Sequence, residues 1–199
     1  MKSLVCIVGI LAATLGPALP AAAQSAAKSG NQAPMAAALE SAMAPGEGQK
    51  KLDPLIGTFN VAIKIWVTPD GPPIETTAAS VNSWVLGGRF VQMMLNGDAP
   101  NAPFSGTGHI GYDNVSKNYQ ASWMDTGSTA ITLYTGNFGA SGKSALLRGS
   151  ISNALTGKPS PVELRMTIEP DGSHLTQLWG QGKGAKMAKL MELKYTKVK

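Results

Sequence analysis

The feature that most constrains the fold is an alternation of apolar and polar residues with a period of two, broken by turn residues at roughly ten-residue intervals. It is strictest over residues 162–169, where one face would carry Val162, Leu164, Met166 and Ile168. A period of two places these side chains on one face of a strand and leaves the other face in water. Residues 61–67 and 191–195 repeat the pattern. The chain therefore predicts half-buried antiparallel strands.

Turn residues divide the region after residue 57 into about ten such strands. Gly87-Gly88 and Asp171-Gly172 are clear hairpin signals, because glycine accepts positive φ at little cost. We expect strands over residues 58–68, 74–86, 89–96, 103–112, 117–125, 129–137, 143–152, 162–169, 173–180 and 187–196. Consecutive hairpins with one apolar face predict an all-β, up-and-down antiparallel barrel, since closure removes exposed sheet edges. Residues 50–56 predict a short N-terminal helical plug.

The N-terminus predicts export. Lys2 precedes an apolar run over residues 4–15, and small residues end in Ala21-Ala22-Ala23. This is the pattern of a signal peptide over residues 1–23, and the run is too short to cross a bilayer. An uncleaved membrane anchor is the alternative. We expect a periplasmic or secreted protein, with a flexible linker or short helix over residues 24–44 and the barrel over residues 45–199.

Cleavage after Ala23 would remove Cys6, the one cysteine of the chain, and with it any disulfide or thiolate site. The net charge of +5 is a mild surplus. It favours solubility and weak contact with anionic surfaces, for which the glycine- and lysine-rich residues 180–189 are the candidate, and it does not predict a nucleic-acid partner.

The search for catalytic or metal-binding motifs finds none. The chain has two histidines, His109 and His174, too few for a metal cluster, and we predict no metal or cofactor. His109 is expected on the surface; a haem ligand is the alternative for it. Gly142-Lys143-Ser144 ends like a phosphate loop, but Asn137 replaces its first glycine. We expect a non-enzymatic protein, although a triad assembled from distant residues stays open.

The predicted barrel offers a place for a ligand. About ten strands enclose more space than the roughly eight at which side chains just fill the interior. Gly106 and Gly108 fall on the inward phase and leave further room. Arg89 and Asp125 end inward-facing rows, where each either pairs locally or orients a ligand head group. We expect a small apolar molecule to bind residues Phe59, Trp84, Arg89, Phe90, Tyr112, Trp123, Asp125 and Tyr195.

Two other functions stay open at this point. A structural or interaction module of the cell envelope would have a filled barrel and a flat apolar patch on its surface. An enzyme with an unrecognised site would have a polar cluster with shifted pKa values inside the barrel.

Several segments resemble the bacterial family known as domain of unknown function 1579. They are residues 45–52, 55–61, 84–90, 111–125, 156–158 and 191–196. The resemblance covers about residue 45 to the C-terminus, and it implies a lipocalin-like β-barrel with no established activity. Gly57-Thr58-Phe59 is also similar to the lipocalin Gly-x-Trp signature, with Phe in place of Trp. The family offers no catalytic residue to transfer.

Overall fold

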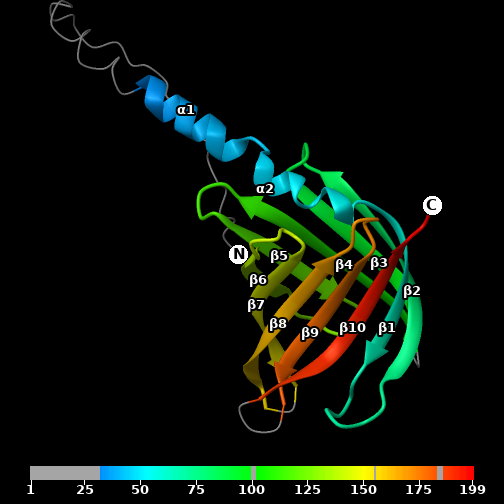
Figure 1. Cartoon of the computed structure of the whole chain (residues 1–199). Coiled ribbons are helices and arrows are strands. Elements are labelled where there is room, and N and C mark those ends of the chain that lie inside the picture. The colour runs from blue at the N-terminus through cyan, green and yellow to red at the C-terminus, as the bar shows by residue number, and fades with distance from the viewer. Residues whose placement is uncertain (1–31, 100–101, 155, 183–185) are drawn as a thin grey trace, which may run out of the picture. The chain divides into compact units, whose positions relative to one another are not determined.

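The computed structural model describes residues 32–99, 102–154, 156–182 and 186–199 (Figure 1). The predicted signal peptide and residues 24–31 of the predicted linker lie outside the described residues. The rest of that linker is helical, since α1 spans Gln32–Met43. Residues 41–199 form one compact unit. Among the described helices, none combines the length and the apolarity needed to cross a bilayer.

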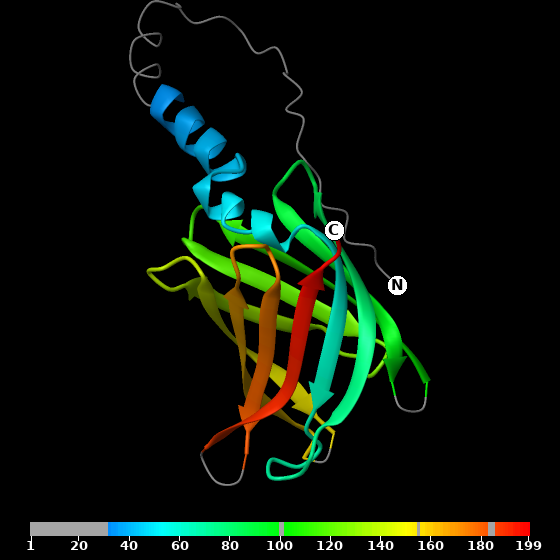
Figure 2. The ribbon, with the colours of Figure 1, turned by 45° about the vertical axis from the view of Figure 1, so that its right-hand side comes forward.

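The compact unit is a closed antiparallel barrel, as predicted. Its strands are β1 (Gly57–Ile65), β2 (Ile74–Val85), β3 (Phe90–Ala99), β4 (Ala102–Asp113), β5 (Asn118–Asp125), β6 (Thr132–Phe138), β7 (Ser144–Asn153), β8 (Lys158–Ile168), β9 (His174–Gln181) and β10 (Met187–Lys197). Each strand pairs with its neighbours in sequence, and β10 closes the barrel on β1 (Figure 2). The register at the seam runs from Phe59↔Lys197 to Ile65↔Met191. Closure leaves no unpaired edge strand in the sheet.

Several strand boundaries differ from the prediction by a few residues, and two of these differences are informative. The first strand ends at Ile65 rather than 68, and Val67 is 76% exposed in the loop that follows. β8 begins at Lys158 rather than 162, in spite of Pro159 and Pro161. This segment pairs with β7, whereas pairing with β9 starts only at Val162. Proline lacks an N–H, so it is tolerated where one side of the strand has no ladder partner.

A helical segment plugs one end of the barrel, as predicted. It consists of α2 (Glu47–Lys50) and the 3₁₀ turn η1 (Asp53–Leu55), and Figure 1 shows it lying across the barrel end at which the C-terminus also emerges. Leu52 and Leu55 are fully buried. Burial of a leucine side chain contributes about 2 kcal/mol from the apolar surface alone. The plug therefore forms part of the core.

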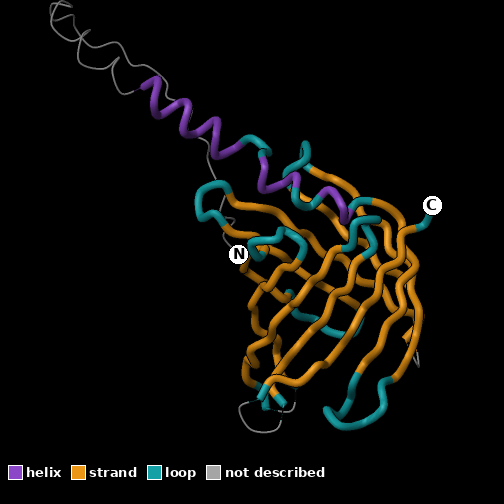
Figure 3. The backbone as a smooth tube through the Cα atoms, in the orientation of Figure 1, coloured by secondary structure: helices purple, strands orange, loops and turns teal. Residues whose placement is uncertain are grey.

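Hydrogen bonds fix the plug to the barrel. The Asn82 side chain donates to the Leu55 carbonyl (2.9 Å), and the Gln49 side chain donates to the Tyr112 carbonyl (2.9 Å). The Tyr119 hydroxyl donates to the Gly48 carbonyl (2.8 Å). The tube view in Figure 3 shows the helical segment running directly into the first strand. These bonds reach β2, β4 and β5, so they fasten the plug to three strands of the barrel.

Candidate functional site

The inward face of the barrel changes in accessibility along its length. Near the plug, Phe59, Val61 and Ile110 are at most 1% exposed. Toward the opposite end, which none of the described helical elements covers, Leu95 and Val162 are at most 2% exposed, but several other inward-facing apolar side chains are only half-buried. These are Ile65, Phe104, Trp123, Ile151, Leu164, Leu178 and Met191. We call this end the open end and the other the plugged end. The accessible apolar lining begins at the middle of the barrel and continues to the open end.

Phe59 and Tyr195, two of the predicted binding residues, lie together near the plugged end. Both face inward, with exposures of 0% and 7%. His174 contacts both of them. Its ring stacks on Tyr195 with centroids 4.1 Å apart, and it makes a T-shaped contact with the Phe59 ring, with centroids 5.0 Å apart. Burial lowers the pKa of His174 to about 4, against a weaker opposing hydrogen bond to the Gly172 carbonyl. The imidazole is therefore neutral at pH 7.

Trp84 and Tyr112 serve the plug. The Trp84 indole nitrogen donates to Asp53 Oδ1 at 3.1 Å, which ties η1 to β2. The Tyr112 ring packs on Tyr119 with centroids 4.9 Å apart, and a Cβ on Gly48 would collide with it. Both aromatics are half-buried and pack against the core. The structure therefore places these two predicted binding residues beside the plug and not along the accessible middle of the barrel.

Trp123 and Asp125 lie together on the inward face of β5, toward the open end. Asp125 Oδ2 accepts a hydrogen bond from the Trp123 indole nitrogen (2.8 Å), and its Oδ1 accepts one from the Gly127 amide (2.9 Å). The carboxylate has local partners, which was one of the two alternatives considered for it.

The glycines on β4 make room for Trp123. A Cβ on Gly108 would lie 2.7 Å from Trp123 Cε3, and one on Gly106 would collide with the same indole. The expectation that these glycines leave free space for a ligand is wrong, because the tryptophan of the neighbouring strand occupies it. Gly106 pairs with Asp125 and Gly108 with Trp123, so the cause is the β4–β5 register.

The expectation that Arg89 and Phe90 face the interior is wrong. Arg89 is exposed and belongs to the turn 86–89, where its guanidinium donates to the Leu86 carbonyl (3.2 Å). Phe90 is 39% exposed and lies across Gly111 on the outer side. Leu86, Gly87 and Gly88 all have positive φ, so the strand alternation stops before Arg89. Inward alternation begins with Val91, which is fully buried.

His109 faces the outside of the barrel, as expected, and His174 is the buried histidine. His109 is half-buried, and its register partners Gln92 and Ser122 belong to the outward-facing set of their strands. The sequence predicts no role for His174, because no serine and acid lie at a known catalytic spacing from it. The alternation of the strand could have predicted that His174 faces inward, because it shares a face with Thr176 and Leu178. Among the described residues, no group of three or more His, Cys, Asp or Glu side chains is placed to hold a metal ion.

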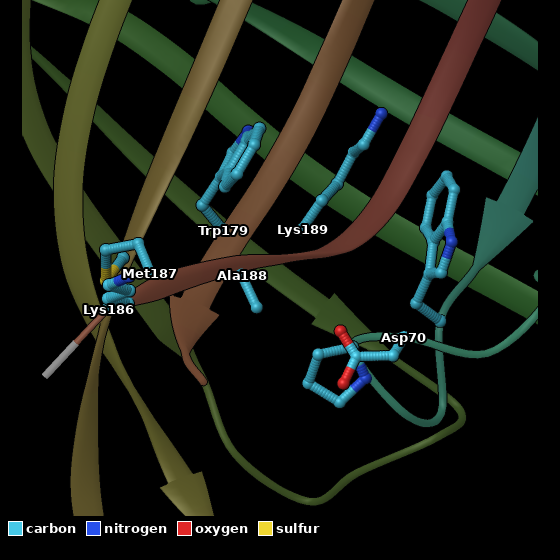
Figure 4. Close-up of a pocket in the computed structure, with 8 residues that line it drawn as sticks. Asp70, Trp179, Lys186, Met187, Ala188 and Lys189 are labelled. Carbon is cyan, nitrogen blue, oxygen red and sulfur yellow. The ribbon is translucent and has the colours of Figure 1, made fainter. Parts of the chain in front are cut away.

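Two pockets open outside this lining. One, of about 370 Å³, lies at the open end against the outer wall and is drawn in Figure 4. Trp179 and Lys189 are register partners there; the Lys189 ammonium lies 4.7 Å from the Trp66 ring centroid and 2.6 Å from Glu192. The other, of about 200 Å³, lies beside the plug and is bordered by Tyr112 and Tyr119. The first has aromatic walls, but cations already occupy positions over its rings, since Arg165 lies 4.4 Å from the Trp179 ring centroid.

One family model matches almost the whole compact unit. The family described as "Protein of unknown function (DUF1579)" matches residues 44–197. The chain belongs to this family. This confirms the resemblance predicted from the sequence. The match spans the plug and all ten strands.

Solved structures support the fold of this DUF1579 member. The chain is similar to the protein in "Crystal Structure of Rv2717c from M. tuberculosis", with a TM-score of 0.58 and 18% sequence identity, over 78% of this chain and 100% of that one. At this identity the likeness concerns the barrel fold alone. A search of curated proteins finds no match.

Proposed function

We propose that this DUF1579 barrel binds a small, largely apolar molecule, which enters at the open end. The observation that carries the proposal is the half-buried row formed by Leu164, Leu178 and Met191. These side chains are cross-strand neighbours on the inward face of β8, β9 and β10. They lie between strand ends rather than at a tip, and yet solvent reaches them. Apolar surface that remains accessible in a concave interior is stabilised when a ligand covers it.

The plugged end supports this direction of entry. Leu52 and Leu55 are fully buried there, and side-chain hydrogen bonds fasten the plug to three strands. A ligand entering at that end would have to break these contacts first. At the open end Trp123 and Phe104 are half-buried, and they pack against the same core cluster. Trp123 would therefore report ligand entry through its fluorescence.

Displacement of the neutral dye N-phenyl-1-naphthylamine by unbranched hydrocarbons tests the proposal. The variant Leu178→Trp should fill the interior and weaken dye binding at least tenfold. Leu178→Ala should leave binding intact or strengthen it, because it widens the same space. Leu175→Trp, on the same strand but in the outward phase, is the matched control and should bind dye like the unmodified protein. Equal dye binding by all four proteins, or no binding by any, would remove the proposal.

We also propose that the protein is exported and that it acts in the periplasm or outside the cell. The support is the signal-peptide pattern of residues 1–23 described above. N-terminal sequencing of protein recovered from a periplasmic extract should begin at Gln24. A chain that begins at Met1 and remains in the spheroplast fraction would contradict it.

One observation favours the alternative of an interaction module. Val81 and Met94 are register partners on the outer face of β2 and β3, and they are 54% and 48% exposed. Exposed apolar patches mark association sites when they are large. Sedimentation velocity of Val81→Lys against the unmodified protein decides it: an oligomer that dissociates in the variant supports a module, and a monomer in both excludes self-association through this patch.

A further inference from the structure

The inward face near the plugged end carries polar side chains in an otherwise apolar surface. Ser80, Asn82, His174 and Thr176 are all at most 9% exposed. Two of them have structural tasks: the Ser80 hydroxyl donates to Asn82 Oδ1 (2.7 Å), and Asn82 in turn donates to the plug. His174 and Thr176 remain, beside Tyr195. A buried polar group needs a partner, so the partners of this second set are informative.

The Tyr195 ring is held rigidly. Tyr195 and His174 are register partners on β10 and β9, and their rings stack with an interplanar angle of 14°. Phe59 meets both rings edge-on, with centroids 5.0 Å from His174 and 6.0 Å from Tyr195. Three aromatic rings from adjacent strands thus fix the direction of the tyrosine hydroxyl. Such preorganisation lowers the cost of binding a partner.

The Tyr195 hydroxyl has no hydrogen-bond partner within the described part of the chain. In the same part, every side-chain nitrogen or oxygen that is completely enclosed does have one. The hydroxyl oxygen must therefore border space that a water-sized probe reaches, although the whole residue is only 7% exposed. At the next inward-facing level toward the open end, Leu193, Met166 and Thr176 are 4–9% exposed, whereas the leucines of the plug are fully buried.

The rings of His174 and Tyr195 carry no charge at neutral pH. Burial lowers the pKa of His174 to about 4 and raises the pKa of Tyr195 above its ordinary value. The charged residue that acts on His174 is Lys197, which is exposed at the plugged end. Asp125 faces inward at the open end, where Trp123 and Gly127 already donate to it. A ligand carboxylate placed beside Tyr195 would lose its hydration without gaining a buried cation, which is unfavourable.

We propose that Tyr195, with His174 and Thr176 beside it, binds the uncharged polar group of the ligand, a hydroxyl or a carbonyl oxygen. The apolar remainder extends along Leu193 and Met191 toward the open end. Tyr195 and Met191 are four steps apart along the strand, a distance of about 13 Å, which suits a medium-length hydrocarbon chain. This inference rests on the proposed function, and it narrows the ligand to neutral amphiphiles.

Competition between matched eight-carbon ligands tests the inference. 1-Octanol, octanoate and octane should each be titrated against protein loaded with N-phenyl-1-naphthylamine. We expect 1-octanol to bind at least tenfold more tightly than octanoate. Tyr195→Phe should weaken 1-octanol at least fivefold and leave octane unchanged. Tyr119→Phe is the matched control, because the hydroxyl it loses is bonded to the plug; it should leave the ratio of 1-octanol to octane affinity unchanged.

The outcomes distinguish a failure of this inference from a failure of the proposed function. Dye binding with no difference between 1-octanol and octane, or a preference for octanoate, overturns the inference and leaves the proposed function standing. No binding of dye or of any ligand overturns the proposed function itself. If Tyr195→Phe does not fold, nuclear Overhauser contacts in the unmodified protein decide: contacts from the Tyr195 ring to C1 of 1-octanol support the inference, and contacts only to the terminal methyl overturn it.

Discussion

The two ends of the barrel are built from the same strands but stabilised differently. At the plugged end, leucines of the helical segment are completely buried, and Trp84 donates to Asp53 to hold them in place. Farther toward the open end, Leu164 of β8 and Leu178 of β9 face the same interior and are half-buried. The comparison teaches that closure of the sheet alone does not fill a ten-stranded barrel. Among the described residues, Leu52 and Leu55 from outside the sheet complete the core at the plugged end.

The largest expected effect is a difference in lost stability between a leucine of the plug and a leucine of the half-buried row. Leu55→Ala in the plug should lower the free energy of unfolding by about 3–5 kcal/mol, because it leaves a cavity in a closed core. Leu164→Ala, in the half-buried row, should cost about 1 kcal/mol, since less apolar surface is lost from water. Urea unfolding followed by circular dichroism measures both. Similar losses for the two variants would show that the ends do not differ in packing.

The second expected effect is a dependence of stability on pH at the plugged end. The pKa of His174 is about 4 in the folded protein and 6.5 as the ordinary value, so between these pH values the unfolded chain binds a proton that the folded chain excludes. Stability is therefore complete above about pH 6.5 and falls as the pH drops toward 4, by at most about 3 kcal/mol.

The variant His174→Phe should flatten this dependence, because phenylalanine keeps the stacked ring and does not titrate. His109→Phe, on the outer face, should leave it intact and serves as the control. Carboxylates whose pKa is lowered by ion pairing, such as Glu163 beside Arg165, lose their contribution only at lower pH. Thermal unfolding between pH 7 and pH 4.5 makes the measurement. A His174→Phe protein with the same slope as the unmodified one would contradict the assignment.

The smallest expected effect concerns the carboxylate at the open end. Asp125→Ala removes the acceptor of hydrogen bonds from Trp123 and Gly127, and it should cost about 1 kcal/mol because the site is partly open to water. The emission of Trp123 should change with it. Asp98→Ala, an exposed residue on β3, should change stability by less than about 0.5 kcal/mol. An Asp125 variant as stable as the Asp98 variant would show that the Trp123 contact contributes nothing measurable.

The strands could be predicted from local patterns, but the inward set of side chains only in part. Val162 and Met166 are buried as expected, because alternation over a full strand admits one orientation. Arg89 was placed wrongly since three consecutive residues with positive φ precede it and end the alternation. The free space inferred from Gly106 and Gly108 belongs to Trp123 because of a pairing that no local pattern reports.

The pairing of His174 with Tyr195 was also beyond local patterns. A register shift in β10 between Lys189 and Met191 places Lys189 opposite Trp179 on the outer wall and Tyr195 opposite His174 on the inner one. Without this bulge, continuation of the Lys189 pairing would put Ser173 opposite Tyr195. One extra residue in a strand reverses which residues face inward beyond it.

The all-β barrel, its ten strands, the plug and the family could be predicted from the sequence, because period two, turn residues and motif spacing are local properties of short segments. The folded barrel was needed to learn which end is filled, which aromatics meet and which hydroxyl has no partner among the described residues. Those properties depend on strand register and on packing between segments far apart in the chain. The contact between Asn82 and Leu55 and the stack of His174 on Tyr195 exist only once the barrel has closed.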